Sequence, residues 1–201
     1  MEKVSPYNIH HMTLQKEKSA LMVVDMQLFF LDPSSPTFTC GGLAVMHNVA
    51  GLIKAFRDAG RPVIFTRHVH HPGLMDAGIM AWWWEGMCLE GSPGCEIHPE
   101  VAPLPGEKVI EKHRYSAFYN TDLETILRVM KIEDLVITGI MTNMCCESTA
   151  RDAYFRDYRV FFPADATGSV NEEFHMASLL NLSYGFAQIM ETVSIRQMMG
   201  S

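Results

Sequence analysis

A cysteine doublet, Cys145-Cys146, is the part of this sequence whose position best suits chemistry. It follows an apolar run at residues 134–140 and opens a helical pattern at residues 142–157. At a helix start, unpaired backbone N–H groups and the helix dipole lower the pKa of a thiol, which makes Cys145 a candidate nucleophile. The alternative is a buried cysteine that only fills space. Because consecutive helix residues are about 100° apart, we interpret Cys146 as packing.

Two further residues with suitable chemistry end predicted strands. Asp25 follows residues 21–24, and Lys112 follows residues 109–111. Ligands of open α/β sheets bind beyond the carboxyl ends of the strands, so we expect Asp25, Lys112 and Cys145 to meet there. The carboxylate can accept the thiol proton, the ammonium favours the thiolate, and the acid formed can protonate a leaving amine. Taken singly, Asp25 also suits a helix cap, and Lys112 also suits a solvated surface charge.

Short apolar runs alternate with helical patterns, which predicts a parallel α/β sheet with helices on both faces. The predicted strands are 20–25, 62–68, 108–112, 134–140, 159–163 and 187–192. The predicted helices are 43–59, 121–130, 142–157 and 172–184. Residues 72–106 are rich in Gly, Pro and Trp, and we expect them to hold a short helix near 75–87 and a binding loop.

The composition predicts one globular domain, residues 1–201, because 48% hydrophobic and 19% charged residues are enough for a sizeable core. A net charge of -7 argues against a nucleic-acid or anionic-membrane binder, since both need a basic face. No signal peptide or 18-residue apolar run is present, so we expect a cytoplasmic protein. Five cysteines without CxxC spacing fit reduced thiols better than a disulfide framework.

Three blocks of sequence, in this order, resemble the isochorismatase-like cysteine hydrolases. They are Val-Val-Asp-Met-Gln at 23–27, Lys-His-Arg-Tyr-Ser-Ala-Phe at 112–118, and the stretch 142–153 around the cysteine doublet. The resemblance spans nearly the whole chain. It implies a Rossmann-like three-layer α/β/α fold with a six-stranded parallel sheet.

The same resemblance implies a catalytic triad of Asp25, Lys112 and Cys145. It also implies a non-proline cis peptide between Ile140 and Met141, with the backbone N–H groups of Met141 and Cys145 directed at an oxyanion. The implied activity is hydrolysis of a small-molecule amide, carbamoyl or ureido C–N bond through a thioester acyl-enzyme.

Within the resembling family, Cys145 favours amide hydrolysis over vinyl ether cleavage, because isochorismatases commonly lack the cysteine. Nicotinamidases carry an Asp-x-His metal site after the second strand, whereas here His68 stands where the Asp would fall. This departure argues against the metal and against nicotinamide. His68, His70 and His71 could still hold an ion, but adjacent strand positions face opposite ways and we expect no carboxylate nearby. We therefore expect no metal and no cofactor.

Residues near the predicted strand ends and in the long segment are candidates for the pocket wall. An aromatic wall can come from the tryptophans at 82–84, although core or subunit packing explains such a cluster equally well. Arg67 and His68 can hold a substrate carboxylate, although an Arg there is as often an ion-pair partner. The predicted substrate-binding residues are Phe30, Arg67, His68, Trp83, Tyr115 and Phe118.

Two alternatives of another class remain. The chain could be a non-catalytic binding module, or Cys145 could be a redox sensor with Cys146 as its neighbour. A sensor has no need of Asp25 or Lys112, whereas a hydrolase needs both. The apolar stretch 176–199 and fifteen methionines lead us to expect a homo-oligomer, a dimer or tetramer, with a small-molecule amide or ureido substrate as the other partner.

Overall fold

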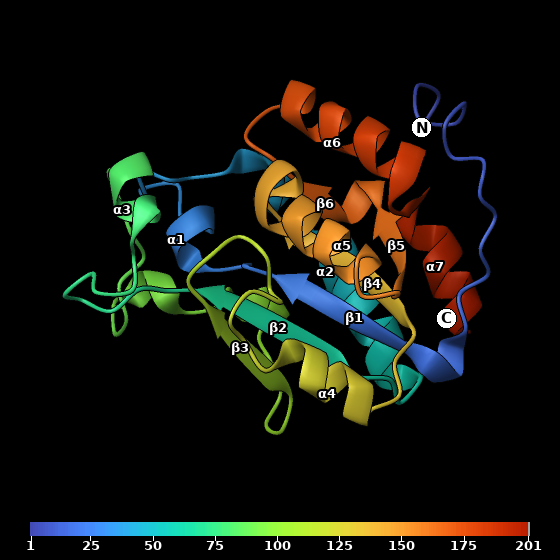
Figure 1. The fold of residues 1–201 in the computed structure, drawn as a ribbon, viewed down its shortest axis with the longest axis horizontal. Helices are drawn as coiled ribbons and strands as arrows, with labels where there is room; N and C mark the ends of the chain where they lie inside the picture. Colours follow the sequence, from blue (N-terminus) through green and yellow to red (C-terminus); the bar gives the residue numbers. More distant parts are fainter. Residues whose placement is uncertain (201) are drawn as a thin grey trace.

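A parallel β-sheet forms the middle layer of the computed structural model, which describes residues 1–200 (Figure 1). Its strand order is β3-β2-β1-β4-β5-β7, and the short β6 pairs with β4. The strands are β1 (Ser19–Val24), β2 (Val63–His68), β3 (Lys108–Lys112), β4 (Asp134–Ile140), β5 (Arg159–Pro163), β6 (Thr167–Gly168) and β7 (Gln188–Met190). All six predicted strands are confirmed. The seventh, β6, has only two residues, which is too short for a periodic pattern to reveal.

Helices cover both faces of the sheet, as the alternating pattern predicted. The four predicted helices between strands are confirmed as α2 (Cys40–Asp58), α4 (Leu123–Val129), α5 (Glu147–Tyr154) and α6 (Glu172–Gly185). The short helix of the long segment is α3 (Ile79–Trp83). The sequence reading missed α1 (Leu28–Leu31) and α7 (Thr192–Met199), and it merged a separate turn, η4 (Thr142–Cys146), with α5.

Successive side chains of β1 point to opposite faces of the sheet, so they contribute to two separate halves of the core. Ala20, Met22 and Val24 pack with α4, α5 and α6, while Leu21 and Val23 pack with α2 and α7 on the other face. Figure 1 shows α4 and α5 in front of the sheet and α2 behind it. Because both faces of β1 are covered, every one of its residues is buried, as a central strand of a parallel sheet requires.

The apolar stretch 176–199, from which we expected a subunit contact, is used largely inside the chain. Leu179 and Leu182 of α6 lie in one core cluster, and Ile195 and Met199 of α7 lie in the other. Packing within one chain therefore explains most of the apolar character of this stretch. Among residues 1–200, no helix combines the length and apolar character needed to cross a membrane.

Gly139 allows the two central strands to approach each other. Its φ is +110°, and it pairs with Val24 of β1. A Cβ at this position would lie 2.2 Å from the Val24 carbonyl oxygen. A side chain is therefore excluded both by the backbone conformation and by the neighbouring strand.

We expect Gly139→Ala to lower the free energy of unfolding by more than about 2 kcal/mol. Urea denaturation followed by circular dichroism measures this change. Gly185→Ala is the matched control, because Gly185 ends α6 and a methyl group added there would have no neighbour within 4 Å. This substitution should change stability by less than about 1 kcal/mol. Equal effects of the two substitutions would contradict the close approach of β1 and β4.

Candidate active site

Three reactive side chains meet beyond the carboxyl ends of strands β1, β3 and β4. Asp25 follows β1, Lys112 is the last residue of β3, and Cys145 lies in η4 after β4. Lys112 Nζ is 2.6 Å from Asp25 Oδ2 and 3.3 Å from Cys145 Sγ. All three side chains are buried. Cys146 is also buried, but it packs in the core and does not line the cavity described below.

Asp25 is held by the neighbouring strand β2. Its backbone N–H donates to Thr66 Oγ1 at 3.1 Å, and the Thr66 hydroxyl donates to Asp25 Oδ1 at 2.5 Å. The other carboxylate oxygen, Oδ2, is buried and accepts no hydrogen bond from residues 1–200 beyond its ion pair with Lys112. Oδ2 therefore retains a lone pair that can accept a proton. Sequence reasoning missed Thr66, which stands within a strand and carries no motif.

The Lys112 ammonium has more neighbours than hydrogens. Besides Asp25 and Cys145, it lies 3.1 Å from the Arg114 carbonyl oxygen and 3.3 Å from His68 Nδ1. An ammonium has three hydrogens, so these four acceptors compete for them. Burial by itself lowers the pKa of Lys112, but the attractions of Asp25 and Cys145 outweigh it and raise the pKa above its ordinary value. Lys112 is therefore a fixed cation at neutral pH.

Burial raises the pKa of Cys145 to about 12, although the Lys112 charge acts in the opposite direction. The lowered pKa that we predicted from a helix start is therefore wrong. Cys145 lies in a π-helical turn of five residues. Burial of the thiolate away from water destabilises it by more than the nearby Lys112 charge stabilises it, so the pKa rises. In the resting protein, Cys145 is a thiol beside a carboxylate.

This pKa predicts how Cys145 reacts with iodoacetamide. Below its pKa, the thiolate fraction of Cys145 rises tenfold for each pH unit. The logarithm of its labelling rate should therefore rise with a slope near one between pH 7 and 9, without a plateau. Peptide mass spectrometry measures this rate, with the exposed Cys40 as the reference in the same sample. A plateau near neutral pH would mean that a thiolate is already present at rest.

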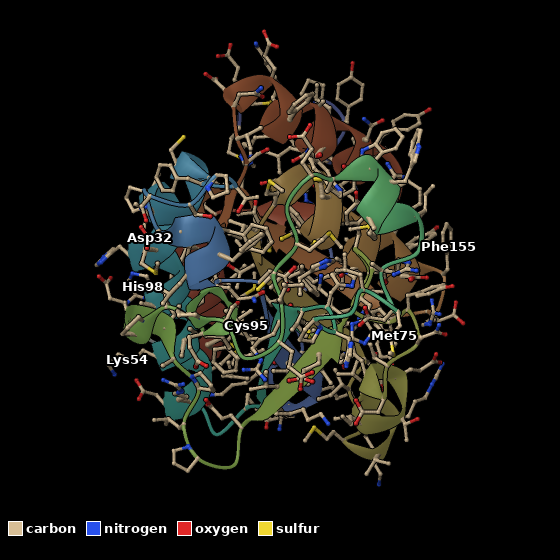
Figure 2. All side chains as sticks on the ribbon, turned by 90° about the vertical axis from the view of Figure 1, so that its left-hand side faces the viewer. Asp32, Lys54, Met75, Cys95, His98 and Phe155 are labelled. Carbon is tan, nitrogen blue, oxygen red and sulfur yellow. The ribbon has the colours of Figure 1, made fainter. Side chains whose placement is uncertain are left out.

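A cavity of about 890 Å³ opens above Cys145. Figure 2 looks onto this end of the molecule, with α1 in blue and α3 in green on opposite sides of its centre. Aromatic and apolar side chains form most of the wall, and Glu85 is the one carboxylate among them. No lysine or arginine lines the cavity in the described chain, so the wall offers no such cation to a substrate carboxylate.

Four of the six predicted substrate-binding residues line this cavity, namely Phe30, His68, Trp83 and Tyr115. Arg67 does not, because it points to the other side of β2 from His68 and pairs with Glu111. Phe118 does not either, because it is buried in the core beside α4 and α5. Of the tryptophans at 82–84, which we considered as an aromatic wall, Trp84 also lines the cavity and Trp82 does not. The sequence interpretation missed Phe29, Phe38, Met80, Val170 and Phe174, which come from separate segments with no shared motif.

His68 has a different environment from the one we predicted. It is buried, and burial together with the Lys112 charge holds its pKa well below the usual range, so His68 is neutral and cannot form an ion pair with a carboxylate. Its Nε2 lies 3.1 Å from Nε2 of His70, whereas His71 is exposed and does not join them. A carboxylate is present after all: Asp76 Oδ1 lies 3.2 Å from His70 Nδ1.

Neither convergent group of side chains fits a metal ion. Asp25, His68 and Cys145 surround the Lys112 ammonium, which already supplies the positive charge between them.

His70, Asp76 and His113 form the second group. His113 Nδ1 lies 2.6 Å from the Val69 carbonyl oxygen. That nitrogen must carry a hydrogen, so it has no lone pair for a metal.

The backbone beside Cys145 contains the cis peptide bond that the resemblance implied. The peptide bond between Ile140 and Met141 is cis, and Met141 and Cys145 both line the cavity. Their amide groups are therefore close to the space in which a substrate carbonyl would react.

The isochorismatase domain model matches residues 19–194. Nicotinamidase 3 of Arabidopsis thaliana is 38% identical over 182 residues, which cover 89% of this chain and 87% of that protein. Ureidoacrylate amidohydrolase of Caulobacter segnis is 31% identical, with 90% of this chain and 86% of that protein covered. The crystal structure of a cysteine hydrolase from Pseudomonas syringae pv. phaseolicola superposes with a TM-score of 0.92 at 26% identity, covering 94% of this chain and 96% of that chain.

Proposed function

The chain belongs to the isochorismatase domain family, and from this premise we propose how it works as a cysteine-dependent hydrolase of a small-molecule C–N bond. It is a hydrolase of carbon–nitrogen bonds other than peptide bonds, as are the nicotinamidase and the ureidoacrylate amidohydrolase that resemble it. The observation that carries the mechanism is the placement of Lys112 Nζ between the Asp25 carboxylate and the Cys145 sulfur.

In the first half of the reaction, Asp25 Oδ2 takes the proton of Cys145 as the sulfur attacks the substrate carbonyl carbon. The Lys112 ammonium stabilises the developing thiolate, and the backbone N–H groups of Met141 and Cys145 hold the oxyanion. The C–N bond then breaks, and protonated Asp25 gives its proton to the departing nitrogen. This leaves a thioester on Cys145 and a free amine or ammonia.

In the second half, Asp25 accepts a proton from water, and the hydroxide oxygen attacks the thioester carbonyl. The C–S bond breaks, the carboxylic acid leaves, and Cys145 recovers its proton. Asp25 thus acts alternately as base and acid. Because burial raises the pKa of Cys145, its thiolate forms and leaves only with the stabilisation that the adjacent Lys112 charge supplies.

We place a neutral aromatic primary carboxamide, a class that includes nicotinamide, first among substrates. This revises our expectation against nicotinamide, which rested on the departure from the Asp-x-His metal motif and not on the cavity wall. The cavity wall is aromatic and apolar, with Phe30, Trp83 and Tyr115 among its residues. Because no lysine or arginine of residues 1–200 lines it and Glu85 adds negative charge, a substrate with its own carboxylate would lose hydration without finding a partner. Ureido and carbamoyl acids are the second candidate, which the ureidoacrylate amidohydrolase relative favours.

An ammonia-release assay distinguishes these substrates. We expect kcat/KM for nicotinamide or benzamide to exceed that for ureido acids by at least about 100-fold, since an unpaired buried carboxylate costs several kcal/mol. The Cys145→Ala protein is the blank. If ureido acids were the best substrates, the ranking of neutral carboxamides that we based on the charge of the cavity wall would be wrong. No hydrolysis of either class would favour the binding module or the redox sensor.

We also propose that the protein acts in the cytoplasm as a homo-oligomer. The homo-oligomer is supported by a set of exposed aromatic residues, among them Trp82, Trp83, Phe155 and Tyr184. Exposed aromatic surface is common where subunits meet. Sedimentation equilibrium gives the assembly mass, and a monomer at micromolar concentration would contradict this part of the proposal.

A further inference from the structure

A row of buried polar side chains leads away from the ammonium group of the site. Lys112 Nζ contacts His68 Nδ1 at 3.3 Å, and His68 Nε2 contacts His70 Nε2 at 3.1 Å. His70 Nδ1 then contacts Asp76 Oδ1 at 3.2 Å. His70 is fully buried, while Asp76 is partly exposed. The row therefore joins the reacting centre to solvent through hydrogen bonds alone.

The direction of every hydrogen bond in this row follows from the ammonium group. An ammonium only donates, so His68 Nδ1 must accept and His68 carries its hydrogen on Nε2. That hydrogen points at His70 Nε2, which must accept in turn. The hydrogen of His70 is then on Nδ1, where it meets the Asp76 carboxylate. Each neutral histidine is thus fixed in one tautomer, with a cation at one end of the row and an anion at the other.

The backbone holds the middle of this row in place. The N–H of His70 donates to the Cys88 carbonyl oxygen at 2.8 Å, and the His70 carbonyl oxygen accepts from the N–H of Glu90 at 2.8 Å. Asp76 is held by the N–H of His71 at 3.0 Å. These bonds tie the row to the long segment whose residues also line the cavity.

We propose that His68, His70 and Asp76 are positioning residues, which hold the Lys112 ammonium against Asp25 and Cys145 and release it when His70 is protonated. This inference rests on the proposed role of Lys112 in the reaction. A protonated His70 carries hydrogen on both nitrogens, so two N–H groups would face each other between His70 and His68. His68 must then move its hydrogen to Nδ1, where it repels the ammonium.

Charged and titratable groups around His70 set the pH at which this happens. Burial lowers the pKa of His70, and Asp76 raises it in part, while the nearby His113 and Arg114 lower it. On the other side, His68 separates His70 from Lys112. The release therefore occurs below the ordinary histidine range, and removal of the Asp76 charge moves it to still lower pH.

Iodoacetamide labelling of Cys145 tests the release without a substrate. In the unmodified protein, the slope of log rate against pH should exceed one and approach two at pH values below the ordinary histidine range, because both the thiol and His70 must lose a proton. In His70→Gln, whose side-chain oxygen can still accept from His68, the slope should stay near one. Asp76→Asn should shift the steep region to lower pH. His47→Asn, on the exposed face of α2, is the control and should match the unmodified protein.

Equal slopes in the unmodified protein and in His70→Gln would overturn the release. Nitrogen NMR of the two rings at pH 8 tests the positioning directly, and requires hydrogen on Nε2 of His68 and on Nδ1 of His70. The opposite tautomers would contradict the proposed positioning of Lys112 by His68 and His70. A stoichiometric metal ion, found by elemental analysis of the purified protein, would contradict it too. Because neither measurement needs turnover, failure of this inference is distinguishable from a failure to hydrolyse amides.

Discussion

Replacing Cys145 with alanine should lower kcat for amide hydrolysis by at least about 10⁴-fold, because among residues 1–200 Cys145 is the one cysteine whose sulfur contacts the Lys112 ammonium. The neighbouring sulfur cannot substitute, since Cys146 is fully buried in the core and does not line the cavity. Steady-state ammonia release measures the loss. Mass spectrometry of the unmodified protein, acid-quenched during turnover, should show the acyl group on the peptide that contains Cys145.

Cys146→Ala is the matched control for this variant. It removes a sulfur from the core cluster shared with α5 and should lower thermal stability, while kcat stays within a few-fold of the unmodified protein. If Cys145→Ala retained most of the activity, or if Cys146→Ala lost as much, the assignment of the nucleophile would be wrong.

The buried ion pair between Lys112 and Asp25 should have the second large effect, on activity and stability together. Breaking it with Lys112→Met should lower the free energy of unfolding by about 3–5 kcal/mol, because Asp25 is left as an unpaired buried charge. It should also lower kcat about 10²–10³-fold, since the thiolate loses its cation. Asp25→Asn should lower kcat by about 10²–10⁴-fold through loss of the base.

The double variant Asp25→Asn/Lys112→Met separates the two effects. With both charges removed, most of the lost stability should return, whereas activity should stay as low as in the worse single variant. Lys54→Met is the control for an ordinary ion pair, because Lys54 and Asp58 are both exposed on α2. It should change stability by less than about 1 kcal/mol. Activity that returned in the double variant would contradict the proposed roles.

Much of the fold could be predicted because burial leaves a direct trace in sequence. Strands β1 and β4 are covered on both faces, so they are continuous apolar runs. Helix α2, with 19 residues, showed its amphipathic pattern, whereas α1 with 4 residues and β6 with 2 are too short to carry one. The C-terminal helix α7 was missed. Its apolar residues were predicted to contact another subunit, because the sequence does not show which surface they cover.

The sequence by itself determined which side chains could react, because Asp25, Lys112 and Cys145 each stand where a parallel strand ends, and such ends lie along one edge of the sheet. The tertiary structure decided how these groups behave. Water exclusion raises the pKa of Cys145, and the side of β2 on which a residue stands separates His68 from Arg67. Asp76 reaches His70 through a loop. Desolvation and through-space contact depend on atoms distant along the chain, and no local pattern of residues contains them.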